Sequence, residues 1–151
     1  MHRFAEGRDL ILGGVKIPHH AGLLGHSDAD VLSHAIADAL LGAVAAGDVG
    51  RHFPDTDPAW RGASSLDILR RVVAIVRGEG VVRIVNVDST VVAQEPRLAP
   101  HVDAMRSNLE EALSVPAASV SVKATTSERL GALGRLEGMA AMASALVEVA
   151  S

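Results

Sequence analysis

The chain has 151 residues, of which 48% are hydrophobic and only 2% aromatic, so it is long enough for one domain with an aliphatic core and short for two. Its formal net charge of -4 and its lack of a Lys/Arg run argue against a surface for nucleic acid or anionic membranes. Because cysteine is absent, disulfides and thiolate zinc sites are excluded, and a bound metal would need histidine and carboxylate ligands.

The amino-terminal stretch MHRFAEGRDL carries no targeting pattern. It has neither the apolar core of a secretory signal nor the Ser- and Arg-rich composition of a transit peptide, and no apolar run of the chain reaches membrane-spanning length. We therefore expect one cytoplasmic domain over residues 1–151, with small molecules or proteins as partners and with neither nucleic acid nor membrane among them.

The first predicted elements are a hairpin and a helix. Two short apolar runs flank Gly13 and Gly14, which predicts a hairpin over residues 9–18 because paired glycines supply the positive φ of a tight turn. After a loop over residues 19–30, Ser27 with Asp30 resembles a capping box that opens a helix ending at Gly47. The apolar side of this helix consists of Leu32, Ile36, Leu40 and Val44.

Residues 47–62 are dense in Gly, Pro and Asp, which predicts a long unbroken loop of the kind that is often functional. A helix capped by Ser64 or Ser65 follows and stops at Gly78 and Gly80. The β-branched residues over 81–93 predict a strand, and residues 101–113 predict a third helix.

The last third of the chain predicts one clear strand and one ambiguous element. Over residues 119–126 apolar and polar side chains alternate, so a strand presents Lys123 and hydroxyl groups on its second face. The final segment, residues 137–150, is open: its Ala and Met favour a helix, whereas its ending ALVEVA suits a strand.

Asp30, His34 and Asp38 recur at intervals of four and therefore share one stripe of a helix. Such a stripe is more often a solvated face than a site. The loop just before it carries His, Ser and Asp at positions 26–28, where the helix N-terminus favours anions, so a metal or phosphate site is the alternative.

Two further polar clusters also have two interpretations. Asp55 and Asp57 in FPDTDP fit either Asx-turn chemistry or a site. In KATTSE, Thr125 with Glu128 fits a capping box, while Lys123 and the hydroxyls fit a phosphate cradle in which Glu128 holds a divalent cation. P-loop, serine-elbow, zincin and Rossmann motifs are absent, so the corresponding enzyme classes lose their usual support.

Six segments, in this order, resemble the 2-C-methyl-D-erythritol 2,4-cyclodiphosphate synthase family of non-mevalonate isoprenoid biosynthesis. They are HRF, LILGGVKIP, GLLGHSDADVLSHAIADALLGA, GDVGRHFPDTDP, AQEPRL and VKATTSERLGALGRLEG, and they cover nearly the whole chain. The resemblance implies a lyase without a side-chain nucleophile. The 2-phosphate of a cytidine-diphospho-methylerythritol attacks the β-phosphorus, closes a cyclic diphosphate and expels CMP.

The resemblance also implies the site residues. The implied metal ligands are His2 and His34 for zinc and Glu128 for a second cation, Mg²⁺ or Mn²⁺, that bridges the diphosphate. The implied catalytic residues are Asp38, Lys123, Thr125 and Thr126. The implied substrate-binding residues are His26, Ser27, Asp48, Gly50, Phe53, Asp55, Ala93, Pro96, Arg97, Leu98 and Arg135. By this resemblance, positions 26 and 27 would contact phosphate, positions 48 and 50 the erythritol hydroxyls, and positions 93 and 96–98 the cytidine.

The family fold implies an α/β domain of the α+β type, a compact sheet packed with helices. Members assemble as homotrimers with their sheets around the threefold axis, and neighbouring subunits share each active site. This assembly favours a strand for residues 137–150, against their helix propensity.

The match departs from the family at the amino terminus. The family's zinc motif is Asp-X-His at the end of a first strand, whereas this chain begins Met1-His2, without that aspartate or that strand. Because a third protein ligand normally makes a catalytic zinc site tight, we expect weaker zinc binding and impaired activity. A truncated start is the explanation we favour. A naturally damaged copy, or another carboxylate such as Asp28 or Asp38 in place of the aspartate, are the others.

Two other functions are rivals. The incomplete zinc site allows a non-catalytic trimer that binds nucleotide or isoprenoid diphosphate. A metal-dependent phosphohydrolase would use His26, Asp28, His34 and Asp55 with water and would release free phosphate. Release of CMP distinguishes the synthase from the binding protein, and a cyclic product in place of free phosphate distinguishes it from the hydrolase.

Overall fold

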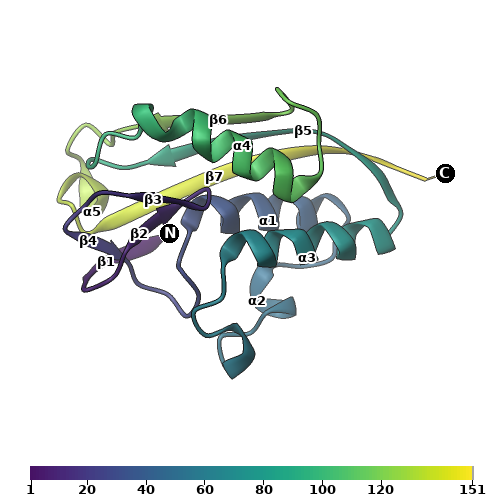
Figure 1. Cartoon of the computed structure of the whole chain (residues 1–151), viewed down its shortest axis with the longest axis horizontal. Coiled ribbons are helices and arrows are strands. Elements are labelled where there is room, and N and C mark those ends of the chain that lie inside the picture. The colour runs from purple at the N-terminus through teal and green to yellow at the C-terminus, as the bar shows by residue number, and fades with distance from the viewer. Residues whose placement is uncertain (151) are drawn as a thin grey trace.

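A layer of helices lies against a sheet in the computed structural model, which describes residues 1–150 (Figure 1). The strands are β1 (His2–Glu6), β2 (Leu10–Leu12), β3 (Val15–Ile17), β4 (Ala21–Leu23), β5 (Val81–Val92), β6 (Val120–Thr125) and β7 (Gly138–Val149). The helices are α1 (Val31–Ala43), α2 (Val49–His52), α3 (Ser65–Gly78), α4 (Val102–Leu113) and α5 (Gly131–Gly134), with 3-10 turns η1 (Pro58–Trp60) and η2 (Ala99–His101).

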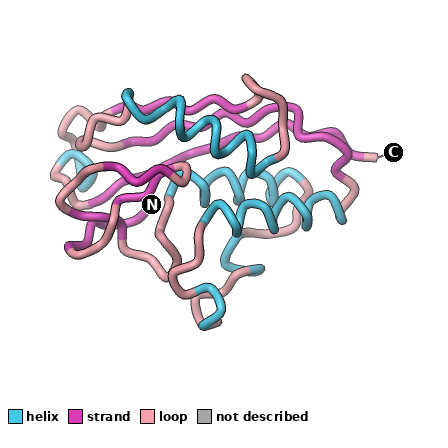
Figure 2. The backbone as a smooth tube through the Cα atoms, viewed as in Figure 1, coloured by secondary structure: helices cyan, strands magenta, loops and turns pink. Residues whose placement is uncertain are grey.

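Within residues 1–150 the larger sheet has five strands in the order β4-β1-β7-β5-β6. Strands β5 and β6 pair in parallel, and the other neighbouring strands pair antiparallel. Strands β2 and β3 form a separate hairpin, which lies near β1 and β4 in Figure 2. The predicted hairpin at Gly13 and Gly14 is therefore confirmed, and both glycines have the positive φ, 53° and 69°, that this turn requires.

The helices cover one side of this sheet with an aliphatic core. Helix α1 packs on β7, α4 packs on β6, and α3 packs on both of these helices. The largest fully buried side chains are all Leu, Ile or Met, as the low aromatic content predicts. Burying one such side chain stabilises the fold by about 1.5–3 kcal/mol. Leu, Ile and Met therefore provide the hydrophobic stabilisation that aromatic side chains provide in many other proteins.

The final segment is a strand, β7, as the family resemblance predicts, and its Ala and Met do not form a helix. Ala141, Ala143, Ala145 and Val147 pack against the core, whereas Met142 and Leu146 are 63% and 59% exposed on the opposite face. Pairing with both β5 and β1 explains the outcome, because two ladders of backbone hydrogen bonds outweigh a helix propensity of a few tenths of a kcal/mol per residue.

Three local predictions are corrected. Helix α1 begins after Asp30, whose carboxylate accepts the N–H groups of Leu32 and Ser33, so Ser27 is not its cap. Residues 47–62 are not an unbroken loop, because α2 and η1 interrupt them. Thr125 and Glu128 form no capping box, since the next helix, α5, starts at Gly131.

No helix among residues 1–150 is long and apolar enough to cross a membrane.

Candidate functional site

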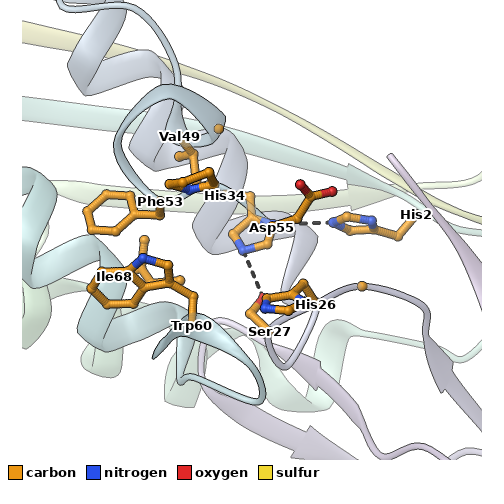
Figure 3. Close-up of a pocket in the computed structure, with 12 residues that line it drawn as sticks. His2, His26, Ser27, His34, Val49, Phe53, Asp55, Trp60 and Ile68 are labelled. Carbon is orange, nitrogen blue, oxygen red and sulfur yellow. Dashed lines mark hydrogen bonds between the residues drawn. The ribbon is translucent and has the colours of Figure 1, made fainter. Parts of the chain in front are cut away.

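Two histidines meet at the edge of a cavity. His2 opens β1 and His34 lies in the first turn of α1, and His2 Nε2 is 3.2 Å from His34 Nδ1 (Figure 3). The rings meet edge to face, with an interplanar angle of 71°. Ring nitrogens that face each other at this distance share one proton or one cation between them.

Both histidines are held neutral near pH 7. Burial, and then the neighbouring His34, lower the pKa of His2 from 6.5 to about 4. Burial also lowers the pKa of His34, although the carboxylates of Asp30, Asp28 and Asp38 act in the opposite direction. Neutral imidazole is the form that ligates metal, so the pair is prepared to give two lone pairs to one ion.

The pair fits a zinc ion by its spacing as well as by its charge. Two nitrogens that each lie 2.0–2.1 Å from a tetrahedral ion are about 3.3 Å apart, which is close to the 3.2 Å between His2 and His34. Among residues 1–150, however, no group of three or more His, Cys, Asp or Glu side chains is arranged to hold a metal. The described chain therefore offers two protein ligands.

The carboxylates near the histidine pair are bonded elsewhere, and they include Asp28 and Asp38, the two considered as replacement ligands. Asp28 accepts hydrogen bonds from the Ser65 backbone and hydroxyl and from the Asp30 N–H. Asp38 Oδ1 accepts the Val49 N–H at 2.8 Å and thereby ties α1 to α2. Burial raises the pKa of Asp30, which is 0% exposed, and its oxygens receive four protein donors. These carboxylates support the histidine site from outside.

The histidine pair opens into a cavity of about 440 Å³. Sequence-predicted residues that line it are His2, His26, Ser27, His34, Gly50, Phe53 and Asp55. Its apolar wall consists of Val49, Phe53, Pro54, Trp60 and Ile68, and Figure 3 shows Phe53, Trp60 and Ile68 grouped on one side. The cavity therefore joins a polar end, with the two histidines, to an apolar end, which suits a substrate with a phosphate and a short carbon chain.

Hydrogen bonds hold the loop that carries His26 and Ser27. His26 Nε2 donates to the Asp57 carbonyl at 3.2 Å, and the Gly62 N–H donates to the His26 carbonyl at 2.8 Å. The Arg8 guanidinium donates to the Ser27 carbonyl at 2.6 Å. Residues 57–62 and Arg8, which follows β1, thus hold the backbone that carries the polar side chains of the cavity.

A second cavity, of about 350 Å³, lies where β5 and β6 end. The predicted residues that line it are Ala93, Pro96, Arg97, Leu98, Thr125 and Thr126. The structure thus brings the segment predicted to wrap cytidine next to two of the hydroxyl residues predicted to bind its phosphates. Parallel pairing of β5 with β6 causes this, because Val92 lies opposite Thr125 in the register.

Five predicted residues lie outside both linings. Asp38 is exposed and bonded to Val49, and the Asp48 carboxylate caps α2 by accepting the Arg51 N–H. The Lys123 ammonium contacts both oxygens of Asp88 at 2.6 Å. Glu128 accepts a hydrogen bond from Thr126, and Arg135 pairs with Glu137. Glu128 is thus linked to the rim of the second cavity, whereas Lys123 and Arg135 are held by neighbours on the surface.

Ser65, which contacts His34 behind the cavity, and Trp60, which lines the cavity, are among the residues that were not predicted as site residues. Ser65, interpreted from sequence as a helix cap, places its hydroxyl 3.0 Å from His34 Nε2. Trp60 packs edge to face on Phe53, with ring centroids 5.0 Å apart, and Arg71 lies over its ring. The contact of Ser65 spans 31 residues of sequence, so no local pattern could reveal it.

The fold and this arrangement agree with one family of enzymes. The model of the YgbB family matches residues 1–148, and the chain belongs to this family. A curated relative from Syntrophobacter fumaroxidans, named 2-C-methyl-D-erythritol 2,4-cyclodiphosphate synthase, is 59% identical over 147 residues, which cover 97% of this chain and 92% of the relative.

Solved structures agree with this assignment. A structure titled 2C-methyl-D-erythritol-2,4-cyclodiphosphate synthase, bound form CDP, is 37% identical with a TM-score of 0.87, and the match covers 97% of this chain and 95% of that one. The bifunctional IspDF from Campylobacter jejuni is 42% identical with a TM-score of 0.94. The match covers 99% of this chain but only 40% of that longer protein.

Proposed function

We propose that the chain converts 4-diphosphocytidyl-2-C-methyl-D-erythritol 2-phosphate to 2-C-methyl-D-erythritol 2,4-cyclodiphosphate and CMP, a lyase reaction of isoprenoid precursor biosynthesis. The observation that carries the proposal is the His2–His34 pair at the edge of a cavity. It occurs in a chain that is 59% identical over 147 residues to a curated synthase of this name.

The reaction needs positioning more than it needs a reactive side chain. An oxygen of the 2-phosphate forms a bond to the β-phosphorus, and the bond from that phosphorus to the bridging oxygen breaks, so that CMP leaves with the electron pair. Such a transfer is accelerated by alignment of the reacting atoms and by neutralisation of phosphate charge. A zinc ion held by His2 and His34 would supply Lewis-acid chemistry and a fixed point for phosphate oxygens.

The first cavity is proposed to hold the methylerythritol part of the substrate. Its Ser27 hydroxyl and His26 ring lie at the polar end, where they would contact phosphate. Asp48 and the backbone of Gly50 would bind the erythritol hydroxyls, and Asp55 would lie near the substrate. The apolar wall, with Phe53 on it, would exclude water from the reacting phosphates, which strengthens every charge interaction there.

The second cavity is proposed to hold the cytidine, between Ala93 and the segment from Pro96 to Leu98. Thr125 and Thr126 lie beside it and would steady the phosphates. Glu128 is exposed and next to them, and carboxylate oxygen is the ligand type that Mg²⁺ or Mn²⁺ prefers, so a second cation would fit here. Lys123 and Asp38 would act as further catalytic residues, and Arg135 as a further anion contact.

A homotrimer with shared active sites is the proposed assembly. The two cavities have no lining residue in common among residues 1–150, so one chain does not unite the metal end and the nucleotide end. Met142 and Leu146 also leave an apolar stripe exposed on β7, the face that sheets around a threefold axis would bury. The proposal includes a single domain over residues 1–151 that works in the cytoplasm.

Release of CMP from the cytidine-diphospho-methylerythritol 2-phosphate, with zinc and Mg²⁺ supplied, tests this function. The product is followed by ³¹P NMR on a sample whose zinc content per chain is known. A cyclic diphosphate formed together with CMP is the expected result. Binding without CMP release would contradict catalysis, and free phosphate without cyclic product would indicate a hydrolase.

A further inference from the structure

His34 makes a second contact on the side away from His2. Its Nδ1 faces His2, while its Nε2 lies 3.0 Å from the hydroxyl oxygen of Ser65. Ser65 is the first residue of α3 and is only 1% exposed. Water therefore does not compete for this hydroxyl, and protein groups determine where its proton goes.

The proton of the Ser65 hydroxyl is donated to Asp28 and not to His34. The hydroxyl donates to Asp28 Oδ1 in a charge-assisted hydrogen bond, and the Ser65 N–H donates to Asp28 Oδ2 at 3.0 Å. A hydroxyl has one proton to donate, so toward His34 this oxygen can only accept. The Nε2 of neutral His34 must therefore carry the ring proton, and its Nδ1 must carry the lone pair.

We propose that Asp28 and Ser65 are positioning residues that hold His34 as the Nε2–H tautomer and so aim its Nδ1 lone pair at the cation shared with His2. The inference rests on the metal site of the proposed function. Neither residue touches the ion or the substrate in this scheme. They act through His34, as outer-shell partners orient histidine ligands in metal sites generally.

The tautomer of His34 has a consequence for His2. Without a cation, the His2 Nε2–H donates to the bare Nδ1 of His34 across 3.2 Å. When a cation binds between them, His2 must also present a lone pair, so its proton moves to its own Nδ1. The cation thus changes the tautomer of His2 but not that of His34.

Ser27 is the competing partner and supplies the control. Its hydroxyl lies 3.4 Å from the same Nε2 and accepts the Ala29 N–H, so its contact with His34 is the longer one. If Ser65 determines the tautomer, Ser27→Ala leaves the His34 tautomer unchanged. Ser65→Thr, which keeps a hydroxyl at the position, is the conservative variant expected to restore what Ser65→Ala loses.

The test is ¹⁵N NMR of the histidine rings in metal-free protein, combined with zinc affinity measured by chelator competition. We expect a protonated Nε2 at His34 in the original chain and a mixture of tautomers in Ser65→Ala. The zinc Kd should rise about 10- to 100-fold in Ser65→Ala and in Asp28→Asn, and recover in Ser65→Thr. Thermal unfolding shows whether each variant is folded. If Asp28→Asn does not fold, the comparison of Ser65→Ala with Ser65→Thr tests the inference without it.

Two results would overturn the inference. One is an original chain with a bare His34 Nε2 or with no measurable zinc affinity. The other is a Ser65→Ala variant with an unchanged tautomer and a zinc Kd within about twofold of the original. An original chain that has the expected tautomer and binds zinc but releases no CMP would contradict the proposed function instead, and would leave this inference standing.

Discussion

His2 Nε2 and His34 Nδ1 lie 3.2 Å apart although 32 positions separate them in the sequence. If this pair is the zinc site, His34→Ala should raise the zinc Kd by more than about 100-fold, because one of two protein ligands is lost. Chelator competition measures this effect. His20→Ala removes an exposed histidine outside the cavity and should change nothing, and an equal loss in both variants would refute the assignment.

The lowered histidine pKa values predict the pH dependence of zinc binding. If both histidines had ordinary pKa values, zinc affinity would fall about 100-fold between about pH 7.5 and pH 5.5, because each histidine would be mostly protonated at the lower pH and would contribute about tenfold. Burial lowers the pKa of His2 to about 4, so His2 stays neutral over this range, and burial also lowers the pKa of His34, so protons compete for it less than for an ordinary histidine. We expect the zinc Kd to change by less than about tenfold over that range. A 100-fold change would show that the pair is solvated.

Much of the fold follows from local sequence patterns. The turn at Gly13 and Gly14 and the helices α3 and α4 depend on residues next to each other in the chain, and sequence patterns located them. The start of α1 was misplaced because Ser27 and Asp30 are both good capping residues. Tertiary contacts favour Asp30, whose second oxygen also accepts the Gly14 N–H from the hairpin.

The contacts within the site, by contrast, join residues far apart in the sequence, and local patterns do not predict them. The family resemblance identified His2 and His34, but nothing in the surrounding sequence indicates that Ser65 lies against the second ring nitrogen of His34. Likewise, the alternation along β6 correctly predicted that Lys123 faces outward. Only the pairing of β6 with β5 shows that its ammonium is bonded to Asp88. Contacts of this kind depend on the register between elements, which one sequence does not reveal.

The buried carboxylate of Asp30 predicts a large effect on stability. It accepts hydrogen bonds from the N–H groups of Leu32, Ser33 and Gly14 and from the Ser33 hydroxyl. Asp30→Ala leaves these donors without a partner and should lower the free energy of unfolding by about 2–4 kcal/mol. Denaturant unfolding measures this.

Asp48→Ala is the matched control for the Asp30 variant. Asp48 also caps a helix, but it is exposed and accepts the Arg51 N–H alone, so its loss should cost about 1 kcal/mol or less. Equal losses in the two variants would mean that the hydrogen bonds of Asp30 to the hairpin and to the Ser33 hydroxyl contribute nothing.

The second cavity predicts a variant that separates nucleotide binding from metal binding. Ala93 lines this cavity and is 6% exposed, so Ala93→Leu should fill part of the space and raise the CMP Kd by roughly tenfold or more. Zinc affinity should remain unchanged, because the histidines lie in the other cavity. Calorimetric titration with CMP measures the effect, and His34→Ala should give the reverse pattern. Loss of both ligands in one variant would argue that the two cavities are coupled.

The exposed stripe on β7 predicts the assembly. Leu146 is 59% exposed in the single chain, so Leu146→Asp should change the stability of an isolated subunit by only about 0.5 kcal/mol. In a trimer whose sheets meet at this face, the same charge would lie in an apolar interface, where an unpaired carboxylate costs several kcal/mol. We therefore expect a folded monomer by sedimentation equilibrium.

Activity distinguishes a shared active site from a complete one. If the metal cavity of one subunit works with the nucleotide cavity of its neighbour, the Leu146→Asp monomer should bind zinc normally but lose at least about 100-fold in CMP release, because the two halves no longer meet. Ala74→Asp adds the same charge to an exposed position on α3 and should leave both assembly and activity intact. A fully active Leu146→Asp monomer would show that each chain completes its own site, and the two cavities would then have to be joined within one subunit.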